Sequence, residues 1–138
     1  MKKLLSLILL FPLFISCSSD NEIIPTIEPE TGDNMTIEQI VGTYILSDLH
    51  IEGLNDAIFG EKIELSFKEN NTLEEFNPQT LERKQYAWTY SNKVISFENT
   101  QHGKIQGWFK NGYLKYKTYA KPNNPNRIGT YTYIKKSN

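Results

Sequence analysis

The sequence predicts an all-β fold: a small eight-stranded antiparallel up-and-down barrel with a short N-terminal helical turn. The first observation is a pair of successive hairpin patterns between Gln85 and Tyr119, with turns at 91–93 and 110–112. The second turn contains Asn111-Gly112, a strong hairpin signal because both residues tolerate the positive φ of a type I′ turn. The second observation is that no helical stretch is long enough for a parallel crossover, so the strands should pair antiparallel.

The third observation is that the predicted connections alternate in length. Links after odd-numbered strands are long, at 50–61, 77–84, 99–103 and 120–126, whereas links after even-numbered strands are tight, at 68–71, 91–93 and 110–112. In an up-and-down meander, all odd-numbered links emerge at one end of the barrel. The alternation therefore predicts one closed end and one open end surrounded by four longer loops.

The first segment, residues 1–16, is predicted to be a lipoprotein signal peptide that lies outside the fold. Lys2 and Lys3 precede an apolar stretch that is too short, at about 12 residues, to span a bilayer core of ~30 Å. The sequence Phe14-Ile15-Ser16-Cys17 resembles a bacterial lipobox. This resemblance implies that Cys17 carries a diacylglyceryl thioether and an N-acyl chain such as palmitate. A cleaved signal that ends near a cysteine by chance is the alternative.

Cysteine content favours lipidation, because Cys17 is the only cysteine and no intramolecular disulfide can form. Residues 17–35 then read as a flexible, lipidated tether with no core-forming pattern. The acidic residues directly after Cys17 resemble the export signal of Bacteroidota-type surface lipoproteins, or they are simply a solvated linker. We expect an outer-membrane lipoprotein held in the bilayer through acylated Cys17, either exposed on the cell surface or facing the periplasm.

The globular domain is predicted to occupy residues 36–138. Thr36 and Gln39 have the spacing of a capping box, and the following turn would place Ile37, Ile40 and Val41 on one side as a plug for the barrel. The first strand opens with Gly42-Thr43-Tyr44 and runs to about Leu49. Seven further strands are expected from their alternating or β-rich patterns, at 62–67, 72–76, 85–90, 94–98, 104–109, 113–119 and 127–135.

From Ile40 to Lys136 this layout resembles the lipocalin-like domain family of Bacteroidota lipoproteins. The lipocalin signature begins Gly-x-Trp at the closed end of the first strand, and here Tyr44 stands in the place of the Trp. In that family a basic residue near the end of the last strand packs over this ring. The resemblance implies that Lys135 or Lys136 has that role.

Alternation also predicts the lining of the barrel. Tyr86, Trp88 and Tyr90 share one face of their strand, and Ile105, Gly107 and Phe109 share a face of theirs. Leu114 and Tyr116 should point inward because Lys115 and Lys117 take the opposite face, whereas the side taken by Tyr131 and Tyr133 stays open. The expected ligand-binding residues are Tyr44, Phe59, Tyr86, Trp88, Tyr90, Phe109, Tyr116, Arg127 and Tyr131.

A cavity lined by tyrosine and tryptophan suits a flat or amphipathic ligand, although an eight-stranded barrel can also be filled by its own side chains. In the longest loop, Leu54, Ile58 and Phe59 would form either a lid over the open end or an apolar segment that simply closes the barrel. From Cys17 onward charge is segregated, because all acids except Glu98 precede Arg83 and all basic residues except Lys62 and Lys68 follow Glu82. This predicts either cross-strand pairing or a basic patch for an anionic ligand, made of Lys104, Lys115, Lys117, Lys121 and Arg127.

Catalysis has little support in the sequence, since neither a nucleophile motif nor a phosphate-binding glycine loop is present. Asp48, His50 and Glu52 could share a face as metal ligands, or they are a polar strand end. Glu74 or Glu75 could form an acid–base pair with Glu98, but only under a strand pairing that the sequence does not show. We therefore expect no enzymatic activity, no cofactor, no metal and no nucleic-acid partner.

The favoured function is the binding of a small hydrophobic or amphipathic molecule inside the barrel of a lipid-anchored envelope protein. The alternative is a non-catalytic interaction module that engages an envelope protein or a glycan through its loops or its basic face. The sequence does not predict the oligomeric state.

Overall fold

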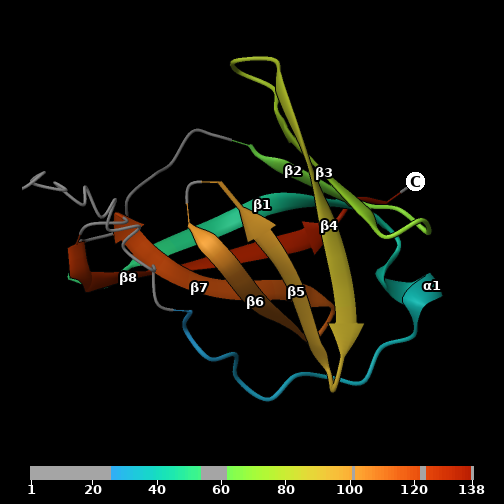
Figure 1. Cartoon of the computed structure of the whole chain (residues 1–138), viewed down its shortest axis with the longest axis horizontal. Coiled ribbons are helices and arrows are strands. Elements are labelled where there is room, and N and C mark those ends of the chain that lie inside the picture. The colour runs from blue at the N-terminus through green and yellow to red at the C-terminus, as the bar shows by residue number, and fades with distance from the viewer. Residues whose placement is uncertain (1–25, 54–61, 101, 122–123, 138) are drawn as a thin grey trace, which may run out of the picture.

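The computed structural model describes residues 26–53, 62–100, 102–121 and 124–137, and it confirms the predicted fold class (Figure 1). Eight antiparallel strands pair in chain order and close into a barrel. After the short helix α1 (Ile37–Ile40), the strands are β1 (Gly42–Ile51), β2 (Glu64–Phe67), β3 (Thr72–Asn77), β4 (Glu82–Ser91), β5 (Val94–Asn99), β6 (Gly103–Lys110), β7 (Tyr113–Lys121) and β8 (Asn124–Lys135). Within the described residues, no helix combines the length and hydropathy needed to cross a membrane.

The two hairpins predicted between Gln85 and Tyr119 are present, as β4–β5 and β6–β7. The β4–β5 turn has positive φ at Asn92 (52°) and Lys93 (66°), and the β6–β7 turn has it at Asn111 (53°) and Gly112 (80°). Two successive positive φ values define the type I′ turn, whose twist matches that of the flanking strands. These turns lie at the end of the barrel that carries α1, which we call the helix end. The opposite end, where β1 ends and β2 begins, is called the loop end.

The predicted ring of four long loops at the loop end is wrong. Only the link between β1 and β2 is long, because the other strands keep pairing into the segments expected to be loops. The ladder of β3 and β4 extends to Asn77 and Glu82. Asn77 Oδ1 then accepts hydrogen bonds from the backbone N–H groups of Gln79 (2.9 Å) and Thr80 (3.3 Å), which closes the turn. Figure 1 shows this hairpin projecting from the barrel.

Closure of the barrel depends on β1 and β8, whose register shifts at a β-bulge. Leu46 pairs with Tyr133 and Asp48 pairs with Thr132, so Ser47 is the extra residue. The Ser47 hydroxyl donates to the carbonyl of Thr132 (3.0 Å), which anchors the bulge. Beyond it, Leu49 pairs with the inward-facing Tyr131, so the inward and outward positions of β1 exchange.

The helix end is closed by the predicted capping box and by the first-strand tyrosine. Thr36 N donates to Gln39 Oε1 (2.8 Å) and Gln39 N donates to Thr36 Oγ1 (3.3 Å). Ile40 is completely buried, but Ile37 is 40% exposed and so does not belong to the plug. The hydroxyl of Tyr44 donates to the carbonyl of Ile40 (2.9 Å), and burial raises the pKa of Tyr44 to about 12.

Of the two candidate lysines, Lys135 is the one that lies over the Tyr44 ring. Its Nζ is 5.7 Å from the ring centroid and donates to the carbonyl of Gln39 (2.7 Å). Lys136 instead forms an exposed ion pair with Glu64 (3.4 Å). Gly42 is needed beside Lys135, because its φ is +139° and a Cβ there would lie 2.7 Å from Lys135 Cε.

Residues 26–35, expected to be the last part of a free tether, lie along the outside of the barrel (Figure 1). Trp108 faces outward on β6 yet is only 1% exposed, and a Cβ on Gly32 would lie 2.9 Å from Trp108 Cβ. Asp33 N donates to the carbonyl of Phe109 (2.6 Å), and Lys117 forms an ion pair with Glu30 (2.8 Å). We call residues 26–35 the strap. The rest of the expected tether, like the signal peptide, lies outside the described residues.

We predict that Lys135→Ala lowers the free energy of unfolding by about 1–2 kcal/mol, because it removes a hydrogen bond to a helix carbonyl and a cation–π contact. The matched control, Lys136→Ala, removes only an exposed ion pair and should cost less than about 0.5 kcal/mol. Urea unfolding followed by tryptophan fluorescence measures both. Equal losses in the two variants would contradict a specific role for Lys135.

Candidate functional site

The interior of the barrel has two halves of different chemistry, and the half near the helix end is a packed aromatic core. The ring of Phe67 contacts Tyr44 edge-on (centroids 5.6 Å apart) and Trp88 edge-on (5.3 Å), and Tyr44 contacts Phe109 (5.8 Å). All four side chains are 1% exposed. Tyr44, Trp88 and Phe109, expected to bind ligand, therefore fill this half themselves.

Tyr90 also belongs to the helix end rather than to a ligand cavity. Its hydroxyl accepts a hydrogen bond from the backbone N–H of Met35 (3.0 Å) and donates to the carbonyl of Asp33 (3.4 Å). The residue therefore fastens the strap to the barrel.

The half near the loop end contains four tyrosines, which we call the tyrosine cluster: Tyr86, Tyr116, Tyr131 and Tyr133. Tyr116 stacks on Tyr131 (centroids 4.8 Å apart) and on Tyr133 (5.7 Å), and its hydroxyl lies 3.1 Å from that of Tyr133. Tyr86 joins the group through Phe97, whose ring lies 6.5 Å from Tyr86 and 5.9 Å from Tyr116. The open question about β8 is thereby resolved, since both Tyr131 and Tyr133 face inward.

A carboxylate faces the tyrosine cluster from β3. Glu75 alternates with the buried Leu73, and its Oε2 accepts a hydrogen bond from Asn99 Nδ2 (3.2 Å). Asn99 is itself only 6% exposed. Lys84 is the register partner of Glu75 on β4, yet among the described residues no ion pair joins the two side chains.

The charge of Glu75 affects the pKa of all four tyrosines of the cluster. Burial is the main cause that raises the pKa of Glu75, while the charge of Lys84 acts in the opposite direction. Burial also raises the pKa of each tyrosine of the cluster, and the Glu75 charge adds to the increase in every case. The four hydroxyls consequently stay protonated at neutral pH, and those of Tyr116 and Tyr133 already bond to each other.

Two buried polar atoms in this half remain unsatisfied. The Tyr86 hydroxyl has no partner among the described residues within hydrogen-bonding distance and angle, although its pKa, which burial raises, is partly lowered by a hydrogen-bonding interaction with the Thr100 side chain. His102 Nδ1 is likewise without a partner among the described residues, its ring lies 6.4 Å from that of Tyr131, and burial lowers its pKa. Buried polar atoms without partners are uncommon and occur at sites that take a ligand or water.

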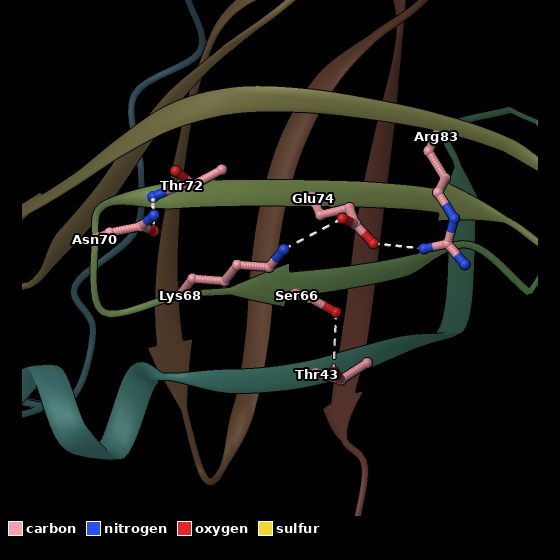
Figure 2. Close-up of polar contacts among 7 residues, drawn as sticks. All are labelled: Thr43, Ser66, Lys68, Asn70, Thr72, Glu74 and Arg83. Carbon is pink, nitrogen blue, oxygen red and sulfur yellow. Dashed lines mark hydrogen bonds and ion pairs between the residues drawn. The ribbon is translucent and has the colours of Figure 1, made fainter.

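The neighbouring Glu74 has the opposite environment (Figure 2). It lies on the outer face, where Lys68 (3.2 Å) and Arg83 both pair with it. The hydrogen bond from Lys68 is the main cause that lowers the pKa of Glu74, and Arg83 adds to it. Glu98 is exposed on β5. Because Glu74 and Glu75 point to opposite faces of β3, the hypothesis of a paired acid and base has no geometric support.

The outer face also carries an open hollow of about 590 Å³ between β1, β2 and the β2–β3 turn. Its wall is held by the contact between Thr43 Oγ1 and Ser66 Oγ (2.9 Å) and by the Lys68–Glu74 ion pair (Figure 2). Of the charged side chains in this wall, Lys68 and Glu74 already pair with each other.

Several other expected site residues lie elsewhere or are not described. Arg127 is exposed at the loop end of β8, whereas Cys17, Leu54, Ile58 and Phe59 lie outside the described residues. Asp48, His50 and Glu52 are exposed on the outer surface, and no group of metal-binding side chains occurs among the described residues. Lys115 and Lys117 face outward as expected. The Glu74–Arg83 pair joins the acidic and basic halves of the sequence across β3 and β4, as the cross-strand interpretation expects. The pairs Glu30–Lys117 and Glu64–Lys136 join the same halves between segments that are not neighbouring strands.

Glu75 and Asn99 are the site residues that sequence reasoning missed. Both continue a strict alternation of inward positions: Leu73 precedes Glu75 by two residues, and Ile95 and Phe97 precede Asn99. This period-2 signal could have placed a carboxylate and an amide inside the barrel. Comparison with protein-family models and with curated proteins finds no match to this chain.

We predict that Glu75→Gln raises the Tm by a few degrees at a pH of about 7.5 and hardly changes it at a pH of about 3.5. A folded-state pKa raised by burial means that Glu75 favours folding below its unfolded pKa, and this contribution is lost as the pH rises through the folded pKa. Glutamine removes the charge, so its benefit appears only at the higher pH. Differential scanning calorimetry at both pH values measures the effect.

The control is Glu98→Gln, which removes a charge from the exposed face of β5 and should have a smaller effect. A lower Tm for Glu75→Gln at neutral pH would show instead that the ionised carboxylate stabilises the fold.

Proposed function

We propose that this protein is a lipid-anchored, lipocalin-like barrel that binds a small amphipathic ligand, non-catalytically, in the half of its interior near the loop end. The observation that carries the proposal is the tyrosine cluster facing Glu75, with unsatisfied polar atoms on Tyr86 and His102. Aromatic walls with a few converging polar groups are the usual composition of small-molecule sites.

The division of the interior supports this location. The half near the helix end is packed and has only 1% exposure at its large rings, so it acts as the rigid base of the site. In the other half, Tyr86 and Tyr131 are only partly buried. Flat rings that remain accessible provide contact area at little conformational cost.

We predict that the domain binds N-phenyl-1-naphthylamine, a flat apolar probe, and that Tyr131→Ala weakens this binding about tenfold because one stacked wall is lost. Probe fluorescence measures the affinity, and circular dichroism confirms folding. The matched control is Tyr113→Ala, because Tyr113 is on the same sheet but is 39% exposed on its outer side. Absence of probe binding, or equal weakening in both variants, would refute an interior site.

The lipid anchor has a separate test. Cys17→Ser in the full-length protein should abolish incorporation of a palmitate analogue and move the protein from the membrane fraction to the soluble fraction. Metabolic labelling and fractionation measure the two effects. Retention of the label by the variant would refute acylation at Cys17.

A second candidate function, an interaction module, is favoured by one observation. Leu81, at the tip of the projecting β3–β4 hairpin, is 73% exposed and has a φ of 60°, an unusual conformation for leucine. Its exposure at the end of a hairpin leaves this apolar side chain accessible to a partner protein.

A further inference from the structure

The polar group of the ligand can be specified further from the surroundings of Glu75. We infer that the ligand carries an amine, and that its ammonium group is bound between the Glu75 carboxylate and the rings of Tyr86, Tyr116 and Tyr131. This inference rests on the proposed function, because it concerns a ligand bound in the same half of the barrel.

The first argument is that no ion pair within the described residues neutralises Glu75, on which Lys84 acts only as a nearby charge. The amide of Asn99 donates one neutral hydrogen bond to it (3.2 Å), and Lys84 forms no ion pair with it among the described residues. On the outer face of the same strand, Glu74 pairs with both Lys68 and Arg83. A half-buried carboxylate without a salt bridge is unfavourable until a cation arrives.

The second argument is the aromatic environment. A tyrosine ring is negative on its face, so it attracts an ammonium group, most strongly where water is excluded. Tyr116 and Tyr131 present stacked rings, and the buried hydroxyl of Tyr86 has a lone pair to accept from an N–H donor. The same surroundings disfavour an anionic headgroup, which Glu75 would repel.

The third argument concerns the apolar surface beside the tyrosine cluster. Gly129 lies on β8 at the inward position two residues before Tyr131. A Cβ added there would lie 3.3 Å from Tyr131 Cε2, 3.5 Å from Leu49 Cδ1 and 3.8 Å from Ile51 Cγ1. Leu49 and Ile51 therefore lie next to Tyr131 and give the apolar part of a ligand a surface to contact.

The test compares three probes with the same ten-carbon chain and different headgroups: decylamine, decanol and decanoate. Each displaces N-phenyl-1-naphthylamine from the native protein, from Glu75→Gln and from Glu98→Gln at a pH of about 7.5, below the critical micelle concentrations. For the native protein and Glu98→Gln, decylamine should bind about tenfold or more tightly than the other two probes, because a charged hydrogen bond is added. In Glu75→Gln this preference should disappear.

The outcomes separate the two proposals. If decanol or decanoate binds as tightly as decylamine, or if Glu75→Gln keeps the preference for decylamine, the amine inference is wrong while the interior site stands. If the native protein binds neither the naphthylamine nor any decyl probe, both proposals fail. A pH titration adds a further readout, because acidification that protonates Glu75 should weaken decylamine binding and leave decanol binding unchanged.

Discussion

Closure of β1 against β8 is the constraint on which the rest of the barrel depends, and the bulge at Ser47 determines how it closes. Uninterrupted alternation from Tyr44 would direct Asp48 and His50 into the interior, together with Leu46. The extra residue exchanges the two faces, so Leu49 and Ile51 line the interior and the polar residues reach solvent. A single unpaired residue therefore keeps the loop-end half of β1 apolar, and it leaves Glu75 on β3 as the carboxylate that faces the tyrosine cluster.

The two halves of the interior differ in the side chains that fill them, although the same eight strands form both. Near the helix end, large rings pack edge to face, and α1 with Lys135 covers them. This half supplies the stability that a small barrel needs. The strap adds a second layer outside the barrel by covering Trp108. The buried core continues from this end into the other half through Phe97, Tyr116 and Tyr133, and there Glu75 and Asn99 add polar groups to it.

Much of the fold could be predicted from local signals. Three short-range features are confirmed: the Asn-Gly turn, the inward positions of Trp88 and Tyr116, and the capping box at Thr36. The lengths of the loops could not be predicted, because strand pairing past Asn77 is set by the register of a partner strand. The strap escaped prediction for a similar reason. Its contacts with Phe109 and Lys117 are long-range, and residues 26–35 have no periodicity that would reveal them.

The candidate site was harder to predict than the fold, because strand alternation shows which residues face inward but not which of them are fully buried and which stay partly exposed. Tyr44, Trp88 and Phe109 share the chemistry of Tyr116 and Tyr131, yet they fill the helix end. What distinguishes the loop end is a local conflict: Glu75 lies inside without an ion pair to any described residue, although an apolar residue there would favour folding. Two other features also depart from the usual rules: Leu81 is exposed with a φ of 60°, and Trp108 Nε1 is buried without a hydrogen bond to a described residue. Glu75 differs from both because it is an ionisable group inside the barrel, and such a conflict between local chemistry and stability is expected of a residue retained for binding, as we propose for Glu75.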